Sequence, residues 1–240
     1  MQPPTHAQTI IFRDDFNGTT LDSTKWSLGT WTLGRTQLGN APVVSGGIAR
    51  LPFDTYGLKG TEIGSKLQFA RGTNGVEIEA RVKLNNLPSG LVTSLFTYVS
   101  ANNLSDEIDF EILSKQVNLT TGGDSILVTT WNNWSEASPT YNDGIHHWGV
   151  SQFVSGLDVN AWRTYTIRWL PDHTEWLLDG ALLYSTNKAL SDSATNVRLN
   201  FWAPASSWTD AYASTLKQAR RPKDNVRYFY DVDWVEVRQL

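Results

Sequence analysis

Acidic and apolar residues alternate in one short segment, Glu107-Ile108-Asp109-Phe110-Glu111, and this alternation sets the strongest limit on the fold. In a β-strand, successive side chains point to opposite faces of the sheet. A strand here places the three carboxylates on one face and sends Ile108 and Phe110 into a core on the other. Three like charges on one strand face repel one another. The row is therefore either a solvated sheet face or a site in which crowding raises at least one carboxyl pKa.

Similar alternation recurs along the chain and predicts further strands. Residues 76–84 alternate strictly between apolar and charged side chains, which indicates a half-buried strand. Residues 175–184 place Asp179-Gly180 between two apolar runs, which is typical of a two-residue hairpin turn. Further strands are expected at residues 10–16, 43–51, 62–69, 92–99, 125–131, 164–170, 197–202 and 228–237.

Two segments do not follow this alternation. Residues 210–219 carry the strongest of a few weak helix signals and are expected to form one short helix. Residues 132–160 are polar and aromatic with weak periodicity, so they are expected to form a long loop over one end or one face of a groove.

Many short strands separated by turn residues favour an all-β fold, either a β-sandwich or a jelly roll. The chain has 240 residues and shows no linker, repeat or low-complexity segment. Residues 1–240 are therefore expected to form a single domain, with residues 1–9 as a flexible N-terminus.

The composition excludes several classes of function. The chain has no cysteine, which rules out disulfides, thiol catalysis and cysteine-ligated zinc. Its net charge of −4, without a long basic run, gives no indication of nucleic acid or an anionic membrane as partner. No apolar run is long enough to span a bilayer. The first nine residues lack the layout of a signal peptide, although a mature secreted domain with a new initiator Met would look the same.

The carboxylate row has a definite chemical use, because a carboxylic acid beside a carboxylate can cleave a glycosidic bond. Four strand residues separate the Cα atoms of Glu107 and Glu111 by roughly 13 Å. If each side chain leans toward the other, roughly 5–7 Å remains between the carboxyl groups. Retaining glycosidases use about 5–5.5 Å and inverting ones about 6.5–9.5 Å, so this spacing permits either stereochemistry. A subset of the eleven tryptophans is expected to form flat platforms for sugar rings.

The segment Glu107 to Glu111 resembles the E-x-D-x-E active-site strand of glycoside hydrolase family 16. That family comprises lichenases, laminarinases, carrageenases, agarases and xyloglucan-active enzymes. The motif lacks the extra residue of the bulged E-x-D-x-x-E version, which favours the lichenase, xyloglucan or carrageenan types over strict β-1,3-glucanases. Further resemblances to the family lie at residues 12–16, 21–26, 89–98, 162–180, 200–202 and 233–235.

The resemblance implies a jelly roll sandwich of two curved antiparallel sheets with a concave substrate groove, and a retaining two-step mechanism. Glu107 would be the nucleophile, Glu111 the general acid and then the base, and Asp109 an assistant to the nucleophile. No cofactor is implied for catalysis, but a structural Ca²⁺ is implied at Asp233 and the carbonyl of Gly47. The residues expected to bind substrate are Glu62, Phe96, Tyr98, Trp131, Asn200, Trp202 and Trp208.

Two departures from lichenases fall in the expected groove. Gly64 stands where lichenases have an arginine, and the loop after Trp131 is longer here. The adjacent His146 and His147 would point to opposite sides of an extended chain, so no metal is expected there.

Three functions remain open. The first is a secreted, monomeric endo-acting retaining β-glycanase acting on mixed-linkage β-1,3-1,4-glucan or β-1,3-glucan. The second is a transglycosylase, or a hydrolase of xyloglucan or of a marine galactan such as agar or carrageenan. The third is a non-catalytic, lectin-like carbohydrate-binding module.

Overall fold

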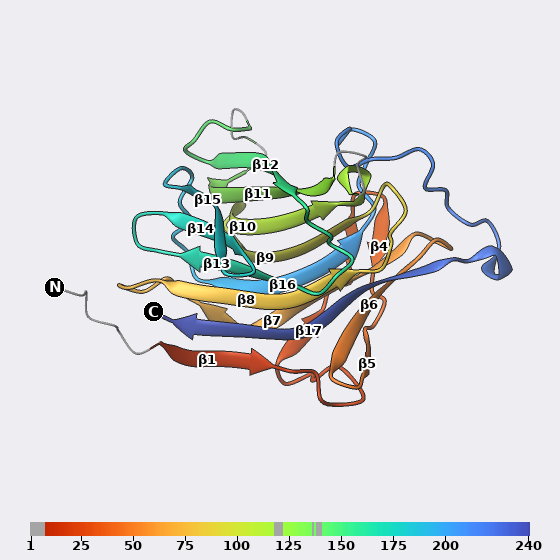
Figure 1. The fold of residues 1–240 in the computed structure, drawn as a ribbon, viewed down its shortest axis with the longest axis horizontal. Coiled ribbons are helices and arrows are strands. Elements are labelled where there is room, and N and C mark those ends of the chain that lie inside the picture. Colours follow the sequence, from red (N-terminus) through yellow and green to blue (C-terminus); the bar gives the residue numbers. More distant parts are fainter. Residues whose placement is uncertain (1–7, 118–121, 136, 138–140) are drawn as a thin grey trace.

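The computed structural model describes residues 8–117, 122–135, 137 and 141–240. These residues form seventeen β-strands and two short 3₁₀ turns, with no α-helix among them. None of the described segments therefore forms a helix with the length and hydropathy needed to cross a membrane. Figure 1 shows the strands as long, curved arrows that follow one another across the molecule.

Seven strands make up one curved, antiparallel layer, called here the groove sheet. In spatial order they are β2 (Trp26–Leu28), β7 (Lys59–Phe69), β16 (Thr195–Trp202), β9 (Val92–Ala101), β10 (Leu104–Leu113), β11 (Gly123–Trp134) and β12 (His147–Ser155).

A second layer, called here the outer sheet, is built around β17 (Arg227–Gln239). One side of β17 pairs with β6 (Ile48–Asp54) and then with β1 (Thr9–Asp14), and the other side pairs with β8 (Val76–Leu84). The sheet continues through β13 (Arg163–Trp169), β14 (Thr174–Leu178) and β15 (Ala181–Thr186), and β5 (Val43–Ser45) pairs with β6. Two short strands, β3 (Thr32–Leu33) and β4 (Thr36–Leu38), pair with each other, and β4 lies parallel to the start of β7. The prediction of an all-β jelly roll sandwich of two curved sheets is confirmed.

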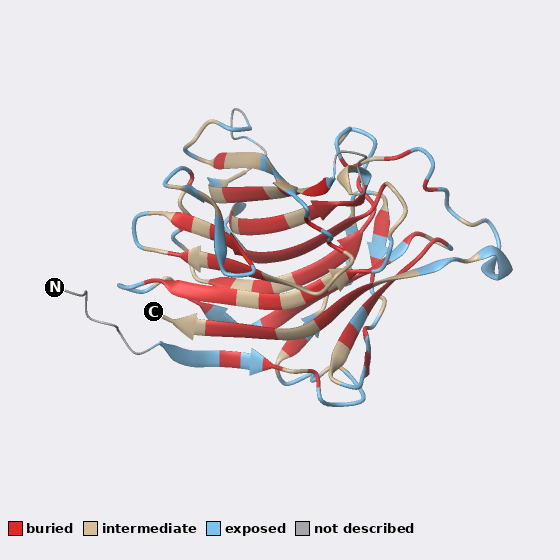
Figure 2. Cartoon of the chain, viewed as in Figure 1, coloured by how far each residue is buried: buried red, intermediate tan, exposed pale blue. Residues whose placement is uncertain are grey.

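The core lies between the two sheets and follows the predicted alternation. On β10, Ile108, Phe110 and Ile112 are buried and belong to the main apolar cluster. The apolar residues of β8 join the same cluster from the outer sheet, from Val76 to Val82. Figure 2 shows this burial as nearly continuous red bands along the central strands. The predicted strand at residues 76–84 is confirmed with the same bounds.

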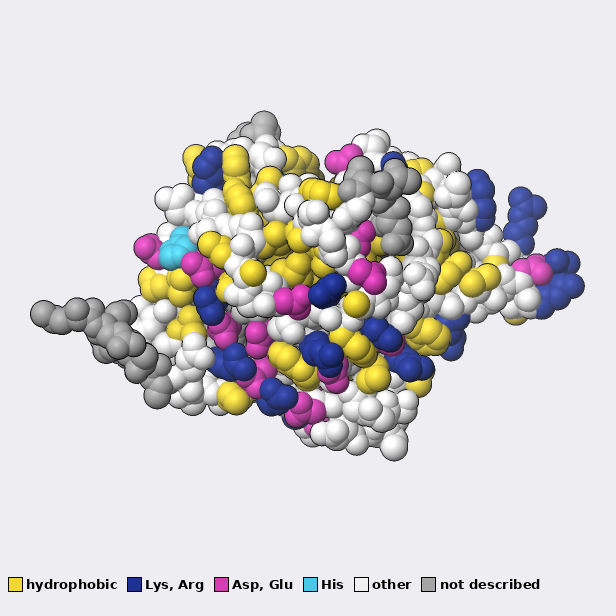
Figure 3. Space-filling model, in the orientation of Figure 1, with side chains coloured by type: hydrophobic (Ala, Val, Ile, Leu, Met, Phe, Trp, Pro, Cys, Tyr) yellow, Lys and Arg dark blue, Asp and Glu magenta, His cyan; other side chains and the backbone are white. Residues whose placement is uncertain are grey.

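The face of the outer sheet that points away from the core is ionic. Glu77 on β8 accepts hydrogen bonds from Arg168 on β13 at 2.7 Å and from Arg238 on β17 at 2.8 Å. Figure 3 shows acidic and basic side chains intermixed over this part of the surface. These cross-strand pairs neutralise the charges of this face locally, in contrast to the carboxylate row on β10.

Three sequence expectations are wrong. Residues 210–219 form turns instead of a helix, and the only helical turn nearby is the 3₁₀ segment Pro222–Asp224. The guanidinium of Arg35 donates to the carbonyls of Ala213 and Leu216, at 3.3 Å and 3.1 Å, and an α-helix over these residues would need the Ala213 carbonyl for its own hydrogen bond to Lys217. Residues 43–51 form a hairpin instead of one strand, because Gly46 and Gly47 both take positive φ, 60° and 76°.

The third error concerns residues 132–160. β11 continues to Trp134, and residues 147–155 form the strand β12, which pairs with β11 at the edge of the groove sheet. The predicted loop is therefore much shorter than its sequence suggested, and part of it, at residues 136 and 138–140, lies outside the described residues.

Replacing Phe110 with alanine tests the core behind the carboxylate row. We expect this substitution to lower the free energy of unfolding by about 3–5 kcal/mol, because it removes a buried ring and leaves a cavity. Urea denaturation followed by tryptophan fluorescence measures the change. Phe153→Ala is the matched control, since that ring is 51% exposed on β12 and its loss should cost less than about 1 kcal/mol. Equal losses for both variants would contradict the burial of Phe110 in the core.

Candidate active site

Strand register places the three carboxylates in one row. β10 pairs with β9 so that Glu107 lies opposite Tyr98, Asp109 opposite Phe96, and Glu111 opposite Ser94. The register shows no bulge between Glu107 and Glu111 on either neighbouring strand. All three carboxylates therefore point to the same face, and the E-x-D-x-E segment is unbulged, as the sequence predicted.

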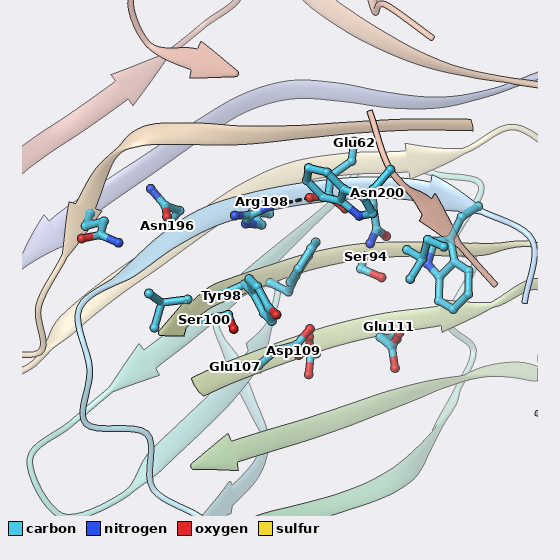
Figure 4. A pocket seen from close by; sticks show the side chains of 16 residues that line it. Glu62, Ser94, Tyr98, Ser100, Glu107, Asp109, Glu111, Asn196, Arg198 and Asn200 are labelled. Atoms are coloured by element: carbon cyan, nitrogen blue, oxygen red, sulfur yellow. Dashed lines mark hydrogen bonds and ion pairs between the residues drawn. The ribbon is translucent and has the colours of Figure 1, made fainter. Parts of the chain in front are cut away.

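This face forms the floor of an open groove with a volume of about 640 Å³. Figure 4 shows Glu107, Asp109 and Glu111 side by side on β10, with polar and aromatic side chains from the neighbouring strands above them. The other lining residues are Trp31, Leu33, Glu62, Gln68, Ser94, Phe96, Tyr98, Val99, Ser100, Asn196, Arg198, Asn200 and Trp202.

Most of the predicted substrate-binding residues come together in this groove. The register continues from Ser94 on β9 to Asn200 on β16, and from Asn200 to Glu62 on β7. The same alternation places Phe96 and Tyr98 on the groove face of β9, and Trp202 lies at the end of β16. Their contact with substrate remains a prediction.

Trp208 and Trp131, the other two predicted binding residues, do not line the groove. Trp208 packs behind Trp202, with ring centroids 5.8 Å apart. The indole Nε1 of Trp131 instead donates a hydrogen bond to Asp109 Oδ2 at 3.1 Å.

Arg198 is a groove residue that the sequence reasoning missed. Its Nη1 donates to Glu62 Oε1 at 2.7 Å, and its guanidinium lies 5.5 Å from the Trp31 ring centroid and 5.1 Å from that of Tyr98. Arg198 lies directly opposite Gly64, where an added Cβ would meet the arginine Cγ at 3.4 Å. A side chain at position 64 would thus lie in contact with an arginine supplied by the neighbouring strand. The alternation of β16 was the available signal, because it places Arg198 on the same face as Asn200.

Burial raises the pKa of all three carboxyl groups in the row. Loss of solvent raises the pKa of Glu107 well above its ordinary value, and the charge of Asp109 raises it further. The same two causes, in the same order, raise the pKa of Glu111. Burial also raises the pKa of Asp109, to about 6, although hydrogen bonds from Thr129 and Trp131 counteract it. Near neutral pH these shifts favour an ionised Asp109 between two glutamates whose protonated forms are stabilised.

The predicted calcium ligands lie away from this groove. Asp233, on β17, forms an ion pair with Arg81 of β8, and Gly47 lies in the turn between β5 and β6. The Arg81 guanidinium already pairs with the only predicted carboxylate ligand. A divalent cation at that carboxylate does not fit beside this positive charge. Within the described ranges, no cluster of three or more His, Cys, Asp or Glu side chains is arranged to hold a metal ion. Calcium binding stays a prediction.

The curved sandwich and its groove of carboxylates and aromatic rings define a carbohydrate-active class of protein. The sequence model for glycosyl hydrolases family 16 matches residues 15–235. The chain belongs to glycosyl hydrolase family 16.

Named relatives and solved structures agree with this placement. The chain is 28% identical over 150 residues to a β-glucanase of Acetivibrio thermocellus, and 26% identical over 174 residues to one of Fibrobacter succinogenes. These matches cover 62% and 67% of this chain but only 39% and 42% of those proteins. Among solved structures, the Bacillus licheniformis β-glucanase superposes with a TM-score of 0.71 at 20% identity, covering 98% of this chain and 99% of the other. The Thermotoga maritima laminarinase catalytic domain superposes with a TM-score of 0.72 at 15% identity, with the same coverage of both chains. At these identities the superpositions show a shared fold.

Replacing Asp109 with asparagine tests the coupling within the row. The Asp109 anion raises the pKa of both glutamates, so a neutral amide should let both values fall. We therefore expect both limbs of the kcat/KM profile for a soluble β-glucan to move to lower pH. The effect should be largest above about pH 6, where Asp109 is ionised in the native protein. Asp210→Asn, at an exposed position, is the control; limbs that stay in place in D109N would contradict the coupling.

Proposed function

We propose that this protein is a retaining endo-β-glycanase that hydrolyses a β-glucan, either mixed-linkage β-1,3-1,4-glucan or β-1,3-glucan. The observation that carries this proposal is the unbulged row of Glu107, Asp109 and Glu111 on the floor of an open groove. Relatives described as β-glucanases, and fold neighbours described as a lichenase and a laminarinase, support the choice of a glucan. An open groove also suits cleavage within a long polymer.

In the proposed first step, Glu107 attacks the anomeric carbon while Glu111 protonates the departing glycosidic oxygen. The glycosidic bond breaks as an ester bond forms between Glu107 and the sugar. Burial and the Asp109 charge favour the protonated form of Glu111, which the acid must have. They act on Glu107 in the same direction, so the assignment of the two roles follows the resemblance of the segment to the E-x-D-x-E strand. Asp109 lies between the two glutamates, and its negative charge raises the pKa of both.

In the second step, Glu111 is ionised and takes a proton from water, which attacks the anomeric carbon. The ester bond to Glu107 breaks and the carboxylate is regenerated. Two successive inversions leave the product with the configuration of the substrate. A transglycosylase would differ only in that a sugar hydroxyl replaces water in this step.

The charge of the groove favours a neutral glycan. Four of the described lining residues are acidic, and Arg198 is the one basic residue among them. Because Arg198 is already paired with Glu62, no basic side chain in this lining is left over for a sulfate group. Trp31, Tyr98 and Trp202 offer aromatic surface for sugar rings. Since a polymeric substrate is met outside the cell, the proposal includes secretion, with the chain acting as a monomer.

Glu107→Gln tests the proposed nucleophile. The amide has the same shape but cannot form the ester, so we expect reducing-end release from lichenan to fall by at least about 10³-fold. Glu175→Gln, on the outer sheet, is the control and should retain activity. Near-normal turnover by E107Q would remove Glu107 from this role. NMR of the first product made by the native enzyme should show the β-anomer, and an α-anomer would contradict retention.

A substrate panel tests the preference for neutral glucan. We expect hydrolysis of lichenan or laminarin to be at least about 10-fold faster than that of κ-carrageenan, because an anionic polymer would meet four groove carboxylates. Xyloglucan and agarose complete the panel, and added acceptor oligosaccharides reveal any transglycosylation. Faster cleavage of the sulfated polymer would overturn the charge argument. Binding to a glucan without release of reducing ends would support the lectin-like alternative.

A further inference from the structure

Trp131 contacts the carboxylate row from the side opposite to the groove-lining strands β9 and β16. Trp131 lies on β11 opposite Glu107 of β10, and its indole Nε1 donates to Asp109 Oδ2 at 3.1 Å. The hydroxyl of Thr129, two residues earlier on the same strand, donates to the same oxygen. Two donors from β11 thus converge on one oxygen of Asp109 and fix the position of its carboxylate.

A second ring holds the indole in place. His147 lies opposite Trp131 on β12, is only 6% exposed, and places its ring centroid 3.8 Å from that of the indole. Trp134 and Tyr141 approach the same indole edge-on, at 5.2 Å and 5.8 Å. Because aromatic neighbours surround the indole, its N–H keeps its direction toward Asp109.

The segment before β12 keeps His147 neutral. The backbone N–H of Asn142 donates to His147 Nδ1 at 2.9 Å, and a backbone N–H can only donate. Nδ1 therefore carries no proton, and the single ring proton lies on Nε2. Burial acts in the same direction, since it lowers the pKa of His147 to about 4.

Asp143 fixes the turn that presents this donor. Its Oδ1 accepts the backbone N–H groups of Ile145, His146 and His147, at 2.8, 2.7 and 3.0 Å. The side chain of Asn142 accepts the N–H of Gly149 at 2.7 Å and ties the turn to β12. The imidazole thus packs against Trp131 as an uncharged ring held in one orientation.

We propose that Trp131 and His147 are positioning residues that hold Asp109 in its ionised form between the two glutamates, so that the segment from Asn142 to His147 sets the pH range of activity. This inference rests on the proposed glycosidase chemistry of β10. It also assigns Trp131 a role different from the sugar platform that the sequence suggested.

The direction of the effect follows from the charges around Asp109. Without the indole donor, the neutral form of Asp109 is favoured over a wider pH range. Its negative charge is what raises the pKa of both glutamates in addition to burial, so both values should fall. The titratable and charged groups around this site are Glu107 and Glu111 on β10, Tyr98 on β9, Arg198 on β16, Glu62 on β7, His147 on β12, and Tyr141, Asp143 and His146 in the segment before β12.

The test compares the pH profiles of three single variants on the β-glucan that the native enzyme cleaves. For Trp131→Phe, we expect both limbs of kcat/KM to move to lower pH by about half a unit or more, with KM within about twofold of native. His147→Leu should shift the limbs in the same direction by less, because it removes only the support of the indole. Trp148→Phe is the control, since it loses an indole hydrogen bond to Tyr184 instead of Asp109, and its limbs should stay in place.

A double variant separates positioning from a general loss of structure. In the D109N background, W131F should add no further shift, because the charge it acts on is gone. Thermal unfolding of each protein shows whether it is folded, and H147L carries the test if W131F does not fold. Unchanged limbs with a KM raised about fivefold or more in W131F would overturn the proposal and make Trp131 a substrate platform.

A failure of the proposed function would look different. The native protein would then release no sugar from any glycan of the panel, and pH profiles could not be measured. In that case, NMR titration of the carboxyl carbons in native protein and W131F measures the Asp109 pKa directly. A higher value in W131F supports the positioning role, and an equal value overturns it.

Discussion

Repulsion among three carboxylates on one strand face governs the arrangement of side chains around β10. It can be tolerated only because the opposite face of β10 is anchored by Ile108, Phe110 and Ile112 in the main core. The strand cannot rotate or shift by one residue to relieve the repulsion, since that would expose the apolar side chains and bury the charges. The charged face instead changes its protonation, and the raised pKa values of Glu107 and Glu111 are the result.

The strands on the two sides of β10 make different contributions to the surroundings of that row. β9, β16 and β7 contribute rings and polar groups that line the groove, from Tyr98 to Glu62. β11 and β12 lie on the other side and contribute hydrogen bonds and packing to Asp109. β10 therefore lies at a boundary, with the groove lining on one side and supporting contacts on the other.

Much of the fold was predictable because it is encoded by short-range alternation. β8, β10 and the β14–β15 hairpin could be identified from residue types and the Asp179-Gly180 turn alone. β12 was missed because it is an edge strand whose exposed positions and polar residues weaken the period of two. The expected helix at residues 210–219 failed for a tertiary reason, since Arg35 lies far away in sequence yet binds the carbonyls of that segment.

The site, like the fold, was predictable where it follows from local alternation and not where it depends on strand pairing. The three carboxylates share a strand, so their common face follows from local sequence alone. Arg198 was missed because its place opposite Gly64 depends on the pairing of β16 with β7, and the direction of the Trp131 indole depends on β12 in the same way. Both departures from lichenases thus have structural counterparts. Gly64 lies opposite Arg198 of the next strand, and the segment after Trp131 contains β12, which brings His147 against the indole. Neither feature introduces a bulge between Glu107 and Glu111 on β10, which is expected if the carboxylate row is the element that tolerates the least change.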